Sequence, residues 1–204
     1  MSIEAIALLN DPVRRGLYEY VAAQGYDVGR NEAAEAAGVQ RTLAAFHLDK
    51  LVEAGLLDAV FRRPAGRGGP GAGRPAKYYR RASGEFAVSV PPRDYRTVAS
   101  LLAEVVKQAG LDGKAEDAAR AYGRTCVGEP EELLRERGYE PYEEDGVLRM
   151  RNCPFHLLAE EYPVLVCSMN LALLEGVVEG CDWRARMDPA PGRCCVALSK
   201  TSEI

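Results

Sequence analysis

The sequence predicts an α+β protein with two domains, residues 1–90 and 91–204. Runs of apolar residues with helical spacing alternate with short strand-like segments in both halves. Pro91-Pro92 interrupts this pattern between the two halves. Charge divides the chain at nearly the same place, because residues 1–97 carry 14 Lys/Arg and 11 Asp/Glu whereas residues 98–204 carry 12 and 19. The net charge of −4 therefore combines a basic N-terminal half with an acidic C-terminal half.

Three helices are predicted in the N-terminal half. Asp11 followed by Pro12 is typical of a helix start, and the apolar stripe of this first helix ends near Gly25. A second helix is predicted from Asn31 to Gly38, and a third over residues 40–54. Two helices joined by a short turn that contains glycine form the pattern of a helix-turn-helix.

Two strands are expected after these helices, over residues 56–63 and 76–81, with a Gly-, Pro- and Arg-rich loop between them. The stretch from Arg62 to Arg81 contains seven basic residues and no acidic one. A strand pair that follows a helix-turn-helix predicts the wing of a winged helix-turn-helix. The basic residues of this wing indicate contact with the phosphates of a nucleic acid.

Double-stranded DNA is therefore the expected partner, and the third helix is the expected recognition helix. In this motif the N-terminal part of the recognition helix enters the major groove and reads base edges. Arg41 is suited to a bidentate guanine contact and Gln40 to an adenine contact. The candidate DNA contacts on the helix and the wing are Gln40, Arg41, Thr42, Ala45, Phe46, Lys50, Arg62, Arg63, Arg67, Arg74 and Lys77.

The C-terminal half is expected to begin with an amphipathic helix over residues 95–109. This helix is the candidate dimerisation element, because a homodimer would match the two-fold symmetry of a palindromic operator, although a core helix has the same pattern. Further helices are predicted over residues 114–124, 130–137 and 163–180, with another after Cys153. Two short strands should flank Asp145-Gly146, and a last strand should cover residues 193–198. Together these elements predict an α+β sensor domain.

Cysteine spacing is the main chemical signal in this half. Five of the six cysteines follow residue 150, and a reducing compartment would keep them as thiols. Cys153, Cys167, Cys181 and Cys194 are separated by 13, 13 and 12 residues, unlike the short spacing of a zinc finger. Four thiolates from separate elements favour an iron–sulfur cluster, with zinc as the alternative metal.

Two further side chains are alternates for this ligand set. Cys195 follows Cys194 directly, and on a strand the two thiols would point to opposite faces, so that only one of them would be a ligand. His156 lies near Cys153 and could replace Cys181. Cys126 is distant from the other cysteines in the sequence and is expected to be a buried small residue.

Two segments resemble known regulators. Residues 11–81 resemble the ArsR-type winged-helix regulators. Residues 138–198, with Asn152-Cys153-Pro154, Cys167 and the closing Cys194, resemble the iron–sulfur-sensing repressor of the Suf cluster-assembly operon and its actinobacterial relatives. Members of that group are dimers that bind a [4Fe-4S] cluster through four cysteines. The resemblance implies Cys153, Cys167, Cys181 and Cys194 as the cluster ligands.

The sequence thus predicts a cytoplasmic transcription regulator whose operator affinity is controlled by an iron–sulfur cluster. No run of about 18 apolar residues would span a membrane, and the N-terminus lacks the features of a secretory signal. An enzyme is not expected, because the chain has only two histidines and no cofactor-binding fingerprint. A metal-free thiol redox regulator, a small-molecule-responsive regulator and a zinc-binding regulator remain alternatives.

Overall fold

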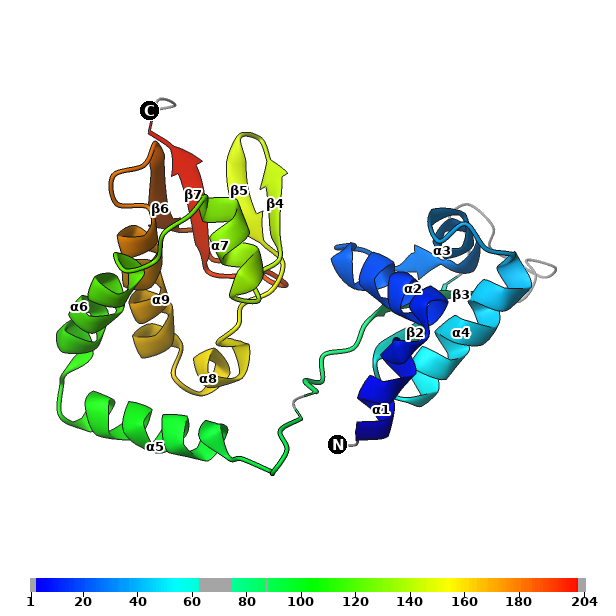
Figure 1. Cartoon of the computed structure of the whole chain (residues 1–204), viewed down its shortest axis with the longest axis horizontal. Coiled ribbons are helices and arrows are strands. Elements are labelled where there is room, and N and C mark those ends of the chain that lie inside the picture. Colours follow the sequence, from blue (N-terminus) through cyan, green and yellow to red (C-terminus); the bar gives the residue numbers. More distant parts are fainter. Residues whose placement is uncertain (1–2, 63–74, 87, 202–204) are drawn as a thin grey trace. The chain divides into compact units, whose positions relative to one another are not determined.

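The computed structural model describes residues 3–62, 75–86 and 88–201 and confirms the predicted α+β class (Figure 1). The chain divides into two compact units, Met1–Arg93 and Asp94–Ile204, called here the N-terminal and the C-terminal unit. The division falls three residues after the boundary expected at residue 90. Each unit contains helices and one small antiparallel sheet.

The N-terminal unit contains the three expected helices and the expected strand pair. A short helix, a 3₁₀ turn and a two-residue strand were not predicted. The two-residue strand, β1, pairs with β3 and so extends the hairpin to a three-stranded sheet in the order β1-β3-β2. Its elements are α1 (Ile3–Ala7), η1 (Leu8–Asn10), α2 (Pro12–Ala23), β1 (Val28–Gly29), α3 (Arg30–Ala36), α4 (Arg41–Glu53), β2 (Leu57–Arg62) and β3 (Ala76–Arg81).

Local chemistry explains where these helices begin and turn. The Asp11 side chain accepts a hydrogen bond from the Arg14 backbone N–H at 2.9 Å and so caps α2. Gly38 has a φ of +63°, a left-handed conformation that allows the chain to leave α3 and reach α4 within a short turn. The predicted inner face of α4 is confirmed, because Ala44, Leu48 and Leu51 are all buried.

The C-terminal unit follows the predicted order of elements, with one additional strand. Its antiparallel sheet has the order β4-β5-β7-β6. The strand that was not predicted, β6, pairs with the whole length of β7, from Trp183 opposite Lys200 to Met187 opposite Val196. The elements are α5 (Tyr95–Gln108), α6 (Asp112–Gly123), α7 (Pro130–Glu136), β4 (Pro141–Glu144), β5 (Val147–Met150), α8 (His156–Glu161), α9 (Pro163–Val177), β6 (Trp183–Met187) and β7 (Val196–Lys200).

The start of the last strand differs from the prediction in a way that matters for the cysteines. The strand was expected to begin at residue 193, but β7 begins at Val196. Cys194 and Cys195 therefore lie in the bend before the strand, after a turn at Gly192 with a φ of +75°. Strand alternation does not apply to them, so the expectation that their thiols point to opposite faces was wrong.

The core of the C-terminal unit lies between α7, α9 and the sheet, where apolar side chains of all three are buried together. Helix α9 is the most apolar helix of the unit, and eight of its residues are buried. Within the described part of the chain, no helix is both long and apolar enough to cross a bilayer.

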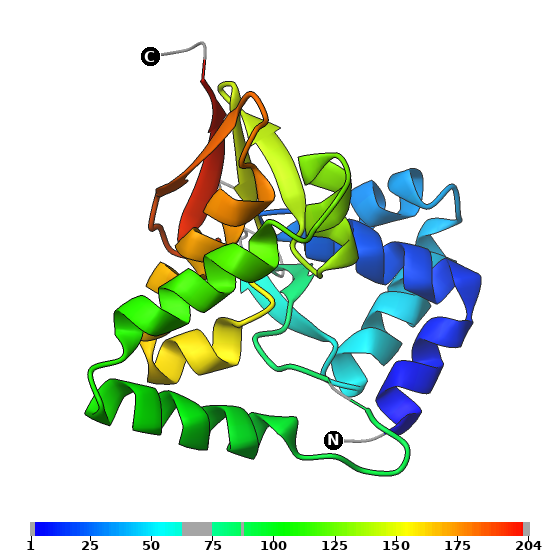
Figure 2. The ribbon, with the colours of Figure 1, turned by 60° about the vertical axis from the view of Figure 1, so that its left-hand side comes forward.

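Helices α6 and α9 lie side by side in both views of the chain (Figures 1 and 2). Their backbones approach most closely at Gly123 and Gly176. A Cβ atom on Gly123 would lie 2.9 Å from the Val177 nitrogen, and one on Gly176 would lie 3.1 Å from the Arg124 nitrogen. Neither position has room for a side chain. Two ion pairs, Arg120–Glu175 at 2.8 Å and Arg124–Glu179 at 2.6 Å, flank this contact.

Replacing Gly123 by alanine should destabilise the C-terminal unit, because the added methyl group must push α6 away from α9. We expect Gly123→Ala to lower the free energy of unfolding by about 1–3 kcal/mol. Gly113, in the first turn of α6, has nothing within 4 Å of an added Cβ. Gly113→Ala is therefore the matched control, and it should be neutral or stabilising by up to about 1 kcal/mol.

The measurement is a urea titration followed by fluorescence of Trp183, which lies in β6 and is the only tryptophan in the chain. Equal unfolding midpoints for the two variants would contradict the close approach of α6 and α9.

Candidate nucleic-acid interface and cysteine centre

The start of α3, the helix α4 and the β2–β3 hairpin border an open pocket of about 660 Å³ in the N-terminal unit. Arg30 and Asn31 contribute from α3, Arg41 from the first turn of α4, and Phe61 from β2. The pocket thus joins the N-terminal end of the predicted recognition helix to the hairpin. The whole lining contains three basic, two acidic and two aromatic side chains, so its charge is mixed with a small basic excess.

The predicted contacts on α4 lie mostly on its exposed side. Gln40 precedes the helix as its N-cap residue, and Arg41 and Thr42 are exposed in its first turn. Phe46 is 54% exposed, whereas Ala45 is half-buried. Lys50 forms an ion pair with Glu53 at 2.7 Å. Arg41 is the exposed cation at the N-terminal end of α4. The positive charge of Lys50, near the other end, is partly compensated by Glu53.

Two of the predicted wing contacts take part in ion pairs within the unit. Arg62, at the end of β2, pairs with Asp27. Lys77, on β3, pairs with Asp49 on α4 at 2.6 Å and lies 5.3 Å from the centre of the Tyr79 ring. Arg63, Arg67 and Arg74 lie outside the residues that the structure describes.

Asp49 is a structural residue of this face that no local sequence pattern indicates. Besides pairing with Lys77, its Oδ1 accepts a hydrogen bond from the Tyr79 hydroxyl at 2.9 Å. Burial opposes ionisation of Asp49, but the hydrogen bonds from Lys77 and Tyr79 outweigh it and lower the pKa of the carboxyl group. The ionised carboxylate ties β3 to α4 and so fixes the hairpin relative to the helix.

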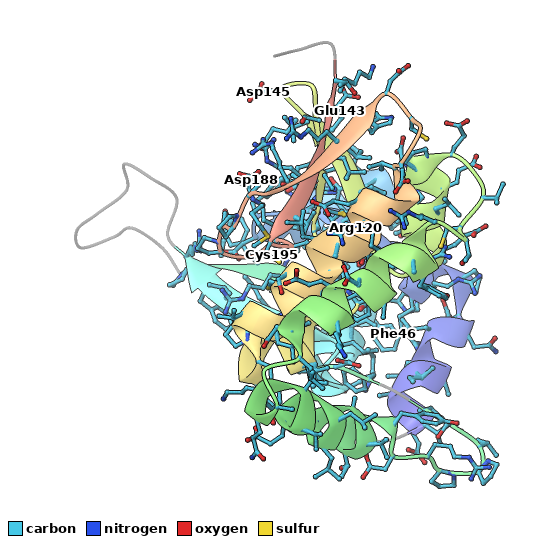
Figure 3. The ribbon with its side chains drawn as sticks, turned by 90° about the vertical axis from the view of Figure 1, so that its left-hand side faces the viewer. Phe46, Arg120, Glu143, Asp145, Asp188 and Cys195 are labelled. Carbon is cyan, nitrogen blue, oxygen red and sulfur yellow. The ribbon has the colours of Figure 1, made fainter. Side chains whose placement is uncertain are left out.

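The C-terminal unit brings four thiols together from three separate places. Cys153 lies in the loop between β5 and α8, Cys167 lies on α9, and Cys194 and Cys195 lie just before β7. Cys194 is within hydrogen-bonding reach of both Cys153 and Cys195, and Cys195 is also within reach of Cys167. Figure 3 labels Cys195 near the start of β7. These four residues are called the cysteine centre below.

Cys194 is the most enclosed member of this centre, with only 3% of its surface exposed. The thiols of Cys153 and Cys195 and the Asn170 side-chain amide can all donate to its sulfur, and these donors lower the pKa of Cys194. The pKa values of Cys153 and Cys195 are raised, because each of these thiols donates its proton in a hydrogen bond to the Cys194 sulfur.

Buried polar contacts brace the loops that carry these cysteines. The Tyr139 hydroxyl donates to Asn170 Oδ1 at 2.5 Å, and Asn170 Nδ2 donates to Cys194 Sγ at 3.3 Å. The Tyr139 ring packs edge-on against Phe155, with 6.3 Å between ring centres. Asn152 Nδ2 donates to the Gly138 carbonyl oxygen at 2.6 Å. The asparagine of the Asn-Cys-Pro segment therefore ties the Cys153 loop to the segment that carries Tyr139.

An ion-pair group holds the segment before Cys194. Asp188 accepts from Arg149 Nε at 3.1 Å and from Arg193 Nη2 at 3.2 Å, and its backbone N–H donates to the Cys195 carbonyl oxygen at 2.8 Å. The Cys194 backbone N–H in turn donates to the Met150 carbonyl oxygen at 2.8 Å. The β6–β7 connection is therefore attached to β5 at Asp188 and again at Cys194.

Cys181 and His156, both named as possible ligands, are not brought to the cysteine centre. Cys181 is exposed and follows the C-terminal end of α9, whereas Cys167 lies near the N-terminal end. The helical rise of 1.5 Å per residue puts roughly 15 Å of helix between Cys167 and that end. The His156 side chain is 59% exposed and lies 3.3 Å from Glu160. Cys126 is half-buried and accepts from Arg137 Nη2 at 2.8 Å.

The cysteine centre offers only sulfur donors, a ligand type that both iron–sulfur clusters and zinc ions accept. Among the residues that the structure describes, no three His, Cys, Asp or Glu side chains are arranged as ligands of a single metal ion. A [4Fe-4S] cluster binds each cysteine to a different iron, so thiols in mutual hydrogen-bonding contact would have to move apart to receive it. The centre therefore matches a cluster in the type of its donors and its largely apolar setting, and not in the spacing of its thiols.

Comparisons with protein-family models, with curated proteins and with solved structures found no significant match to this chain.

Proposed function

We propose that this protein is a DNA-binding transcription regulator whose operator affinity is controlled by a [4Fe-4S] cluster held by Cys153, Cys167, Cys194 and Cys195. The observation that carries the proposal is the convergence of these four thiols from three separate elements. The set differs from the one that the resemblance implies, because Cys195 takes the place of Cys181. The protein would act in the cytoplasm, where reducing conditions keep cysteines available as ligands.

The arrangement of the N-terminal unit supports the DNA-binding part of the proposal. Helices α3 and α4, joined by the turn at Gly38, have the order of a helix-turn-helix, and the β2–β3 hairpin follows as a wing would. Arg41 and Thr42 are exposed in the first turn of α4, the part of a recognition helix that meets base edges. We assign this unit as a winged helix-turn-helix on these grounds.

The cysteine centre provides a physical basis for a switch. A bound [4Fe-4S] cluster would supply one-electron redox chemistry and sensitivity to oxidants. The chain's own contribution is to link the β5–α8 loop, α9 and the segment before β7 through ligands to one group. Losing that link would free these elements, because the ligands then keep only their weaker mutual contacts. In a dimer, such a change can alter the spacing of the two DNA-binding units.

Helix α5 supports the homodimer that this mechanism needs. Four of its large apolar side chains are more than half exposed, namely Val98 at 54%, Leu101 at 63%, Leu102 at 61% and Val105 at 59%. Their spacing puts them on one face of the helix. An exposed apolar stripe of this kind marks an interface, and a second copy of α5 would present a matching stripe under two-fold symmetry.

Arg41→Ala should weaken binding to the specific operator by about 1–3 kcal/mol, because a bidentate base contact would be lost. Arg15→Ala, on the exposed side of α2, is the control, since it removes the same charge outside the pocket bordered by α4. Both variants are compared by fluorescence anisotropy on a genomic operator fragment at fixed salt concentration. Equal affinities for the two variants would contradict the assignment of α4 as the recognition helix.

The ligand assignment predicts which cysteine variants lose the cluster. Anaerobically purified wild-type protein should contain iron and sulfide, and Cys153→Ser and Cys195→Ser should lose most of both. Cys181→Ser should retain the wild-type content, because Cys181 is exposed and distant from the centre. Iron loss in Cys181→Ser with full retention in Cys195→Ser would restore the ligand set that the resemblance implies.

A metal-free thiol switch is the second candidate, and the contacts of Cys194 with both Cys153 and Cys195 favour it. Its signature would be an iron-free protein whose operator binding changes on oxidation and recovers with a thiol reductant. That result would contradict the cluster.

Leu101→Lys should convert the dimer to a monomer, because it places a charge in the proposed α5 interface. Val127→Lys is the control, since Val127 is 91% exposed and lies outside α5. Sedimentation equilibrium distinguishes the two states. A Leu101→Lys protein that remains fully dimeric would exclude this face of α5 as the interface.

A further inference from the structure

The pocket bordered by α3, α4 and the β2–β3 hairpin contains a cation outside the predicted set of DNA contacts. Arg30, the first residue of α3, lines this pocket together with Arg41 and Lys77. Arg30 is half-buried, whereas Arg41 is exposed. The two arginines therefore differ in their access to solvent, although they border the same space.

Strand pairing holds Arg30 beside the hairpin. Gly29 directly precedes Arg30 and pairs with Tyr78 of β3 in the β1–β3 ladder. The two residues pack closely, because a Cβ atom on Gly29 would lie 3.6 Å from a carbon of the Tyr78 ring. The sheet thus fixes the start of α3 relative to the hairpin, and Arg30 with it.

The acidic side chains of the pocket are engaged by other donors. Asp49 forms an ion pair with Lys77 at 2.6 Å, and Glu32 Oε1 accepts from the Tyr26 hydroxyl at 2.7 Å. Among the residues that the structure describes, no carboxylate lies within ion-pair distance of Arg30. Its guanidinium group is therefore partly buried without an anion to compensate its charge.

A guanidinium group that is partly removed from water loses hydration, and an anion offsets that loss. The described residues of the unit do not supply this anion, so one from outside the chain fits the position. In a helix-turn-helix, the helix before the recognition helix crosses the phosphate backbone of the duplex. Arg30 belongs to that helix, α3, and the backbone phosphates of DNA are anions that arginine binds with matching geometry.

We propose that Arg30 binds a phosphate group of the DNA backbone and so contributes affinity that does not depend on base sequence. The inference rests on the proposed function, because it requires the N-terminal unit to bind DNA. Arg41 would read a base edge, whereas Arg30 would fix the position of the duplex on the unit. Neutralising one phosphate releases counterions, so this contribution weakens as the salt concentration rises.

The experiment measures the affinity of the full-length protein for the operator fragment and for a scrambled duplex of the same length, by fluorescence anisotropy at several salt concentrations. Arg30→Gln removes the charge and keeps most of the side chain. We expect about fivefold weaker binding to both duplexes at about 0.15 M salt, and a dependence of log K on log salt that is shallower by about 0.9. Arg30→Lys should restore most of this slope, because it retains the charge.

Arg15→Ala is the control, since Arg15 is an exposed cation of α2 that does not line the pocket. It should leave the slope unchanged. If Arg30→Gln does not fold, Asn31→Asp decides the question, because Asn31 is exposed, lines the same pocket and lies in the first turn of α3, where an acidic residue favours the helix. Asn31→Asp should weaken binding to both duplexes by repelling the phosphate.

An unchanged slope in Arg30→Gln would overturn the role of Arg30 and leave DNA binding intact. A loss confined to the operator fragment would also overturn it, because the contact would then be with a base. Inorganic phosphate should not compete with DNA at constant ionic strength, and competition that Arg30→Gln abolishes would assign the position to a free anion instead. A wild-type protein that binds neither duplex would overturn both proposals.

Discussion

The close approach of α6 and α9 is the contact on which the arrangement of the C-terminal unit depends. It requires glycine at both Gly123 and Gly176, because a Cβ atom at either position would overlap backbone atoms of the other helix. With its last turns fixed in this way, α9 presents Cys167 and Asn170 from its earlier turns toward the start of β7. The cysteine centre therefore depends on a contact that contains no cysteine.

Ion pairs between residues distant in the sequence shape the candidate nucleic-acid interface of the N-terminal unit. The stretch from Arg62 to Arg81 is basic in sequence, but three of its described cations form ion pairs within the N-terminal unit, namely Arg62 with Asp27, Lys77 with Asp49 and Arg80 with Asp58. Lys77 thereby positions the hairpin against α4. A cation that is already paired gains less binding free energy from a phosphate than an exposed one, so Arg41 is the leading candidate on α4 for the proposed DNA contact.

Much of the fold could be predicted because its signals are local. Asp11-Pro12 and Asp145-Gly146 mark a helix start and a hairpin turn, and the structure has both. Strand β6 was missed because its sequence, Trp-Arg-Ala-Arg-Met, is rich in charge and becomes a strand only by pairing with β7. The ion pair between Lys77 and Asp49 joins residues far apart in the chain, and no local pattern reveals such a contact.

The α+β class, the order of most elements and the cysteines available for a site all follow from local patterns in the chain. Which of those cysteines meet depends on how the elements pack. The length of α9 separates Cys167 from Cys181, and the turn before β7 releases Cys194 and Cys195 from strand alternation, so that both thiols join the centre. Spacing along a chain gives the number of intervening residues, whereas the distance between two thiols depends on the helices and turns that those residues form.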